Sequence, residues 1–352
     1  MSNNSLPNVK FESIKSIFNC IASSNNLSRA IISANTSLSV VTVGKIVDTL
    51  LDLNILTQNK ASRSSAGRRA GVVNINKSYF SLIFDLTDYN LRCSVIDLKL
   101  NQVDFIERRY DTLTSFPDNL SSFINLTKSC VNMKYNFDNC MGIGVAVPGI
   151  YDNESDCARS SRIPEIIVIP IFKFFKKHFP NNIVFVESNA ISAGLSNVLN
   201  ISGFEKKDIV YCNFSPSNVC GAHFVNGHLQ GGRSNAACDI GRMILDIDIT
   251  LEERITLCKK DSDLADTMSC AIYNIIRVLS PHSFIIEYNM PFCTDKVNEM
   301  ICDILIQKYK LPKLYLPEFH NATFKINNSH YGLAISLREK WLQKCIIDDY
   351  NN

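Results

Sequence analysis

The chain has 352 residues, of which 46% are hydrophobic and 20% charged, and its formal net charge is +2. This length and composition are typical of a globular protein with two or three domains, and they exclude a disordered or collagen-like chain. No run of about 18 apolar residues is present, and the polar start Met1–Ser5 lacks the basic and apolar regions of a signal peptide. We therefore expect a cytoplasmic protein that has no membrane partner.

The thirteen cysteines are scattered along the chain, and no two of them form a CxxC pair. Neither a zinc ribbon nor a redox dithiol is indicated, so we expect no metal and no cofactor. The cysteines are interpreted as small buried apolar residues.

Charge is unevenly distributed along the chain. Residues 1–77 carry nine Lys or Arg against three acids, whereas the remaining 275 residues carry 27 against 31. A basic module ahead of a larger, mildly acidic one favours an anionic partner such as nucleic acid. A solvated basic surface without any partner would give the same pattern.

Apolar residues at helical spacing predict three helices in the basic module, over residues 9–21, 29–34 and 40–53. Ser28 and Ser39 stand where helix N-caps are expected, and the short turn Asn35–Leu38 separates the second helix from the third. Two helices joined in this way indicate a helix-turn-helix, whose second helix enters the major groove of DNA.

A wing is predicted after these helices, because residues 55–58 and 71–75 can pair as strands around the basic loop 59–70. Two arginines near Gly67 and Gly71 in this loop suit a narrow minor groove. The side chains expected to contact DNA are Arg29, Ser39, Val41, Thr42, Lys45, Lys60, Arg63, Arg68 and Arg69.

The body of the chain shows strand patterns first as hairpins and later alternating with helices. Strands are predicted at 82–86, 91–96, 103–109, 141–147, 183–187, 209–214 and 219–225, and helices at 117–131 and 190–198. This order indicates a mixed α/β architecture.

Five short motifs follow one another along the chain: Gly67–Arg69, Val147–Gly149, Glu187–Ala190, Asn226–Leu229 and Ala237–Arg242. In this order, and behind a winged helix-turn-helix, they resemble the ROK family of sugar kinases and sugar-responsive repressors. The resemblance spans residues 14–342 and implies an actin-like (ribonuclease H-like) fold of two lobes.

The resemblance also implies a division of the chain. The DNA-binding domain with its basic linker would cover residues 1–77 and the actin-like domain residues 78–352. The lobes of the latter would comprise residues 78–190 with 330–352, and residues 191–329. The basic first module is typical of the regulators in this family rather than of its kinases.

Departures from the family pattern argue against kinase activity. The position of the family's catalytic aspartate is Asn189, and a carboxamide cannot take a proton from a sugar hydroxyl at neutral pH. Glycines that would let backbone N–H groups reach nucleotide phosphates are missing from Asp85–Tyr89, Ser215–Ser217 and Glu287–Tyr288. The chain has only 14 glycines in all. Arg242 replaces the family's zinc-binding histidine, so no metal is expected there.

The residues that could line an effector cleft, by the same resemblance, are Pro148, Gly149, Glu187, Asn189, Asp239 and Arg242. The arginine would suit a phosphorylated or acidic sugar. A vestigial pocket, retained only for folding, is the alternative.

Together these observations predict a DNA-binding transcriptional regulator, expected to be a repressor, that acts on a double-stranded operator as a homodimer or homotetramer. A sugar or sugar phosphate would be its effector. Two alternatives stay open: an ATP-dependent sugar kinase that carries a DNA-binding module, and an effector-independent DNA binder whose large domain serves only for dimerisation.

Overall fold

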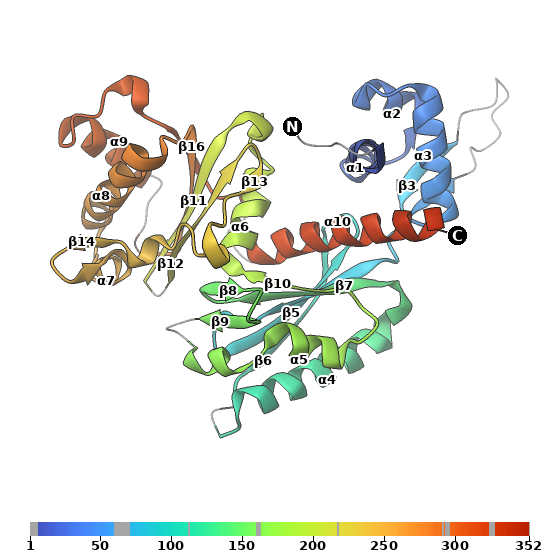
Figure 1. Cartoon of the computed structure of the whole chain (residues 1–352), viewed down its shortest axis with the longest axis horizontal. Helices are drawn as coiled ribbons and strands as arrows, with labels where there is room; N and C mark the ends of the chain where they lie inside the picture. Colours follow the sequence, from blue (N-terminus) through green and yellow to red (C-terminus); the bar gives the residue numbers. More distant parts are fainter. Residues whose placement is uncertain are drawn as a thin grey trace.

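The computed structural model describes residues 6–59, 71–111, 113–159, 163–216, 218–290, 292, 296–323 and 328–351, except for the side chains of 6–10, 234 and 347–351. Three bodies are visible in Figure 1: a small N-terminal module and two larger lobes, each built around a sheet. One long helix, α10 (Asn328–Asn351), runs from the junction of the lobes to the N-terminal module.

The N-terminal module is a winged helix-turn-helix, as predicted. Its elements are α1 (Leu6–Ala22), α2 (Arg29–Thr36), α3 (Val40–Asp52) and a sheet of order β1-β3-β2, with β1 at Leu27–Ser28, β2 at Leu56–Asn59 and β3 at Val72–Ile75. The side chains of Ser28 and Ser39 accept hydrogen bonds from the N–H groups of Ile31 and Thr42, so both act as the N-caps that the sequence indicated.

No single helix in the described ranges combines the length and the apolar character needed to cross a membrane. Helices α2 and α3 are long and apolar enough only when they are counted as one segment. The chain bends by 117° between them.

The first lobe contains a five-stranded sheet of order β10-β7-β4-β5-β6. Its strands are β4 (Phe80–Asp85), β5 (Asn90–Asp97), β6 (Gln102–Arg109), β7 (Cys140–Val147) and β10 (Val184–Ser188). Helices α4 (Phe116–Lys134) and α5 (Ile171–His178) cover one face over an apolar core, and a hairpin of β8 (Ile150–Asp152) and β9 (Cys157–Arg159) lies beside them. Helix α10 packs on the opposite face through Leu333, Ala334 and Leu337.

The second lobe contains a sheet of order β13-β12-β11-β16-β17. Its strands are β11 (Asp208–Ser215), β12 (Asn218–Val225), β13 (His228–Leu229), β16 (Ser283–Tyr288) and β17 (Glu318–Asn321). One face is covered by α7 (Leu251–Thr256), α8 (Asp261–Leu279) and α9 (Val297–Gln307), near the hairpin of β14 (Ile244–Asp246) and β15 (Ile249–Thr250). The other face is covered by α6 (Asn189–Val198).

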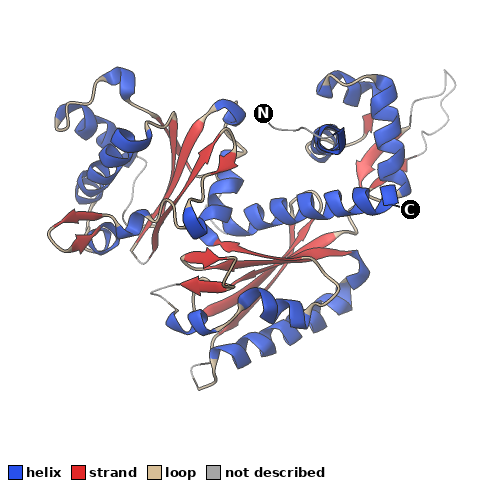
Figure 2. Ribbon diagram, viewed as in Figure 1, coloured by secondary structure: helices blue, strands red, loops and turns tan. Residues whose placement is uncertain are grey.

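The two lobes meet where α6 crosses α10, so the body is layered as helix, sheet, paired helices, sheet, helix (Figure 2). The crossing is close: a Cβ atom added at Gly332 of α10 would lie 1.8 Å from the carbonyl oxygen of Ser192 in α6. A domain boundary at residue 77 would fall between β3 and β4, whereas a lobe boundary at residue 190 would cut α6 after its second residue. The observed architecture confirms the predicted mixed α/β fold with two lobes.

Candidate functional site

The outer face of α3 is the first candidate site. Val40 and Val41 are 59% and 69% exposed at the start of this helix, although residues of this type are usually buried. Helical spacing places Gly44 and Lys45 on the same side, opposite the buried Val43, Ile46, Val47 and Leu50. No described atom lies within 4 Å of a Cβ added at Gly44, so the fold itself does not require a glycine there.

Other residues expected to contact DNA already have partners within the module. Arg29 forms an ion pair with Asp48 of α3, with Nη2 2.5 Å from Oδ1. The hydroxyl oxygens of Ser39 and Thr42 lie 2.8 Å apart at the helix start. A DNA contact by Arg29 would therefore compete with its bond to Asp48.

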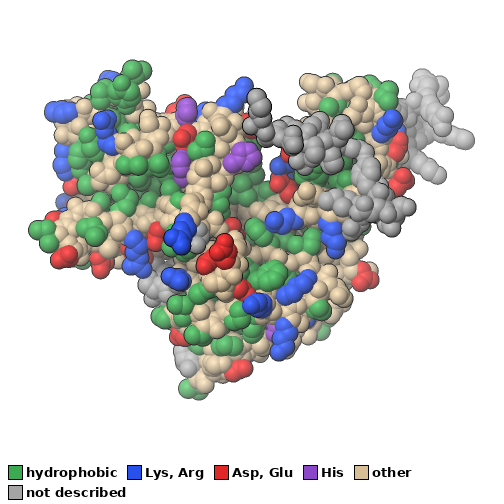
Figure 3. Space-filling model, in the orientation of Figure 1, with side chains coloured by type: hydrophobic (Ala, Val, Ile, Leu, Met, Phe, Trp, Pro, Cys, Tyr) green, Lys and Arg blue, Asp and Glu red, His purple; other side chains and the backbone are tan. Residues whose placement is uncertain are grey.

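Four of the residues expected to contact DNA, Lys60, Arg63, Arg68 and Arg69, lie outside the described residues. On the face seen in Figure 3, the Lys and Arg side chains are scattered over both lobes as well as the N-terminal module. Among the described residues, the exposed start of α3 therefore marks the candidate DNA-binding face.

The β7 and β10 strands bring the expected effector residues of the first lobe together. They pair in parallel with Val147 opposite Ser188, so Pro148 and Asn189 follow at the same sheet edge. Glu187 precedes them, and its carboxylate accepts a hydrogen bond from the N–H of Ser188 at 2.8 Å. Burial raises the pKa of Glu187 to about 7.

The expected effector residues of the second lobe are placed differently. Asp239 directly precedes the 3₁₀ turn Ile240–Arg242, Arg242 is its last residue, and both are exposed. Burial of part of its carboxyl raises the pKa of Asp239, and the nearby Arg242 opposes that rise. Of the six residues proposed for an effector cleft, only Asn189 lines the cavity described next.

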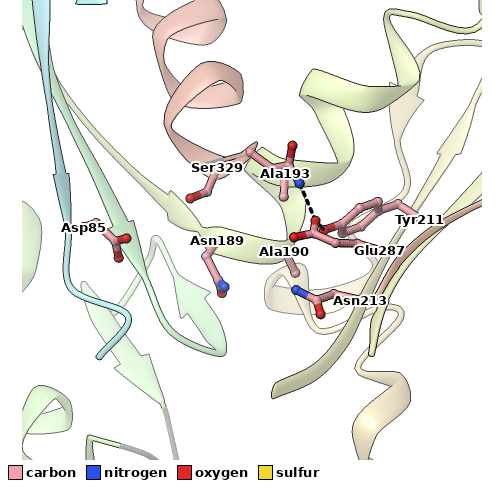
Figure 4. A pocket seen from close by; sticks show the side chains of 9 residues that line it. Asp85, Asn189, Ala190, Ala193, Tyr211, Asn213, Glu287 and Ser329 are labelled. Carbon is pink, nitrogen blue, oxygen red and sulfur yellow. Dashed lines mark hydrogen bonds between the residues drawn. The ribbon is translucent and has the colours of Figure 1, made fainter. Parts of the chain in front are cut away.

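This cavity, called here the interlobe cavity, has a volume of about 110 Å³ and lies between the lobes where β4 ends and α6 and α10 begin. Figure 4 shows that side chains from both lobes surround it. The lining residues are Asp85, Asn189, Ala190, Ala193, Tyr211, Asn213, Glu287, Asn328 and Ser329.

Glu287 is the centre of one half of the interlobe cavity. The hydroxyl of Tyr211 donates to its carboxylate at 2.6 Å, and the side-chain amide of Asn328 donates to the same oxygen. Burial raises the pKa of this carboxyl, and the two hydrogen bonds oppose the rise. One carboxylate thus connects β11, β16 and the first turn of α10.

Asp85 occupies the other half. Burial alone would raise its pKa, but contacts with His330 Nε2 at 3.2 Å and with the N–H and hydroxyl of Thr87 outweigh it and lower the pKa. The turn after Asp85 is closed by side chains, since Asp88 accepts from the N–H of Asn90 and from Arg92. Asp88 therefore places a carboxylate within this turn and holds it through side-chain hydrogen bonds.

The sequence did not single out five of the lining residues: Ala193, Tyr211, Asn213, Asn328 and Ser329. Tyr211 and Asn213 stand two positions apart, on one face of a strand whose other face presents Val210, Cys212 and Phe214 to the core. The sequence signal that could have identified this cavity is Asn213, a polar residue near the end of an otherwise largely apolar strand.

Comparisons with known proteins agree with this architecture. No family model matches the chain. A xylose repressor from Staphylococcus xylosus is 25% identical over 260 residues, which cover 70% of this chain and 63% of the repressor, so the chain spans less than two thirds of that relative's length.

Two solved structures share the fold. A ROK family transcriptional regulator, described as a homologue of the E. coli MLC protein, matches with a TM-score of 0.72 at 14% identity, over 96% of this chain and 97% of the other. A putative N-acetylmannosamine kinase from Listeria monocytogenes matches with a TM-score of 0.59 at 14% identity, over 75% of this chain and 99% of the other. The chain is thus similar in sequence to a xylose repressor, and it shares its fold with ROK family proteins, including a transcriptional regulator over nearly the whole chain.

Proposed function

We propose that the chain is a sugar-responsive transcriptional repressor that binds double-stranded DNA through α3. The observation that carries this proposal is the solvent-facing side of α3, where Val40, Val41, Gly44 and Lys45 have no packing role in the module. A recognition helix directs its N-terminal residues to base edges in the major groove, where valine suits a thymine methyl group and lysine suits guanine or phosphate. The similarity to a xylose repressor supports the same function.

We propose further that a homodimer presents two such helices to half-sites about 34–36 Å apart, one helical turn of DNA. The kinase alternative is disfavoured because Asn189 cannot act as the base and because the turn after Asp85 is filled by its own side-chain bonds. Pro216 also removes a backbone donor from the turn between β11 and β12. The absence of kinase activity is thus part of the proposal.

Replacing Lys45 by alanine is expected to weaken operator binding by about 1–3 kcal/mol, because the helix loses a contact in the groove. Fluorescence anisotropy with DNA from upstream of the encoding gene, titrated at several salt concentrations, measures the loss. Lys77→Ala is the matched control, since this exposed lysine carries the same charge but follows β3 rather than lying on α3. Equal affinities for Lys45→Ala and the wild type would refute the assigned DNA face, and absence of salt-sensitive, sequence-selective binding would refute the function.

Replacing Gly44 by alanine is expected to have opposite effects on folding and on DNA binding. Alanine favours a helix by about 0.5–1 kcal/mol over glycine, and the new methyl group meets no described atom, so the melting temperature should rise. The same methyl group would obstruct close approach of α3 to the groove and cost about 1–2 kcal/mol, or roughly tenfold in affinity. Thermal melts measure the expected rise in melting temperature, and fluorescence anisotropy on the same preparation measures the expected loss of operator affinity. An unchanged affinity would contradict the close approach of α3 to the groove.

A further inference from the structure

We propose that the outer side of the first lobe carries a separate site for a small organic anion with an apolar body. This site, called here the α4–α5 groove, is formed by Lys128 and Asn132 of α4, by Phe137, and by residues 178–182 at and after the end of α5. The proposal goes beyond the repressor function and does not depend on DNA binding.

The α4–α5 groove has room for a small ligand. Its volume is about 350 Å³, against about 110 Å³ for the interlobe cavity. Small-molecule sites in proteins commonly measure roughly 300–1,000 Å³. Helices α4 and α5 cover the face of the first sheet that lies opposite α10 (Figure 1). The groove is therefore separated from the interlobe cavity by the sheet itself.

The floor of the groove is apolar. Phe179 directly follows α5 and is only 2% exposed, and its ring stacks on that of Phe137 with 6.1 Å between the ring centres and 5° between the planes. Phe137 begins the 3₁₀ turn that comes soon after α4, and the exposed Pro180 extends the same surface. The end of one helix and the turn after another thus bring their apolar rings together, and an apolar ligand body would cover them.

One side of the groove carries positive charge. Lys128 reaches from α4 to the end of α5, where its Nζ donates to the carbonyl of His178 at 2.5 Å and lies 4.4 Å from the centre of the Phe179 ring. The last turn of α5 adds Lys176 and Lys177. None of the residues that line the groove is an aspartate or glutamate. An anion placed here would meet the ammonium group of Lys128 and no opposing carboxylate.

This charge is only partly compensated by the protein. An ammonium group has three N–H donors, and the carbonyl of His178 takes one of them. Burial lowers the pKa of Lys128, and no carboxylate in the described part of the chain pairs with it. Burial also lowers the pKa of His178, and the charges of Lys128 and Lys177 lower it further. The bond to His178 explains why Lys128 stabilises the end of α5, but it leaves two donors for a ligand.

Amide side chains add further donors at the rim. Asn132 and Asn181 are exposed, line the groove and form no side-chain hydrogen bond with the described residues. Hydrogen bonds from an ammonium group to an anionic oxygen are shorter and stronger than those between neutral groups. The groove therefore fits a carboxylate or a phosphate ester whose charged group lies at Lys128 and whose apolar part lies on the rings.

The experiment titrates the full chain with four probes in about 0.15 M salt and measures binding by saturation-transfer difference NMR. Benzoate, phenyl phosphate or both should bind with a Kd of about 1 mM or lower. Benzyl alcohol lacks the charge and acetate lacks the ring, so each should bind at least about tenfold more weakly. The tighter of the two aromatic anions identifies the charged group that the site prefers.

Three results with the wild type would overturn the proposal. If neither aromatic anion binds, the groove is not a ligand site. If benzyl alcohol binds as tightly as benzoate, the positive charge has no role in recognition. If acetate binds as tightly as benzoate, the apolar floor has none.

Asn132→Asp tests whether the anion lies in this groove. It adds a negative charge at an exposed rim position and should weaken binding of the tighter anion by about tenfold. Asn125→Asp is the matched control, because it makes the same change on the same face of α4 but does not line the groove. Two helical turns separate the positions by about 10 Å, which exceeds the Debye length of about 8 Å. Equal binding by the two variants would overturn the assignment.

Lys128→Met tests the ammonium group itself. Methionine keeps an apolar chain over Phe179 but removes the charge, so this variant should lose at least about tenfold in affinity for the tighter anion. Urea denaturation shows whether the variant is folded, since its bond to the end of α5 is also lost. A folded Lys128→Met protein that binds the anion as the wild type does would refute the site. If the variant does not fold, the comparison of Asn132→Asp with Asn125→Asp decides.

Discussion

Substitution of Gly332 by alanine is expected to lower the unfolding free energy by about 3 kcal/mol, because α6 and α10 would have to separate. The added Cβ would lie 1.8 Å from the carbonyl oxygen of Ser192 and 2.6 Å from its carbonyl carbon. Both atoms belong to the backbone of α6, so no side-chain rotation relieves the overlap. Urea denaturation of the full chain, monitored by circular dichroism, measures the loss.

Gly194→Ala is the matched control, since it adds a methyl group in α6 near the same helix pair. Its Cβ would lie 2.8 Å from an edge atom of the Phe224 ring, and an aromatic ring can move where a backbone cannot. We expect a loss of about 1 kcal/mol or less for this variant. A Gly332→Ala protein as stable as Gly194→Ala would show that the helices are not in backbone contact.

Substitution of Arg338 by alanine is expected to loosen the N-terminal module from the body, at a cost of about 2–3 kcal/mol. The guanidinium of this α10 residue donates to the carbonyl of Leu98 at 3.4 Å and to the side-chain oxygen of Asn19 at 3.3 Å. It also lies 5.1 Å from the centre of the Phe18 ring. Burial lowers its pKa to about 10, so the charge stays within the interface at neutral pH.

Calorimetry should show the N-terminal module unfolding in a separate transition below the main one in Arg338→Ala, and hydrogen exchange should show lost protection in α1. Lys15→Ala is the control, because it breaks the more exposed ion pair with Glu339 between the same two helices. An exposed pair contributes about 0–1 kcal/mol, so this variant should unfold as the wild type does. A single unchanged transition in Arg338→Ala would mean that the apolar contacts alone hold the module.

The two substitutions test the contacts of α10 at two places along its length. Gly332 lies against the backbone of α6, and Arg338 lies against α1.

Several elements could be predicted because their signals are local. Helices α2 and α3 follow serine caps and repeat their apolar residues at helical spacing, so neighbouring residues are enough to define them. The strands β4, β5 and β7 are rich in apolar residues over short stretches, so they too could be predicted from neighbouring residues. Helices α5 and α9 and the strand β17 were not predicted: α5 follows Pro170 directly, and β17 has only four residues.

The sequence by itself determined the winged module and the resemblance to the ROK family, since each depends on which side chains stand in short, ordered motifs. Only the tertiary structure decided which residues line the interlobe cavity. Asp85 and His330 meet although they are 245 positions apart, and the amides of Asn189, Asn213 and Asn328 gather in one cavity from three elements. An isolated polar residue carries no local pattern, and its surroundings are created only when the two sheets pack against α6 and α10.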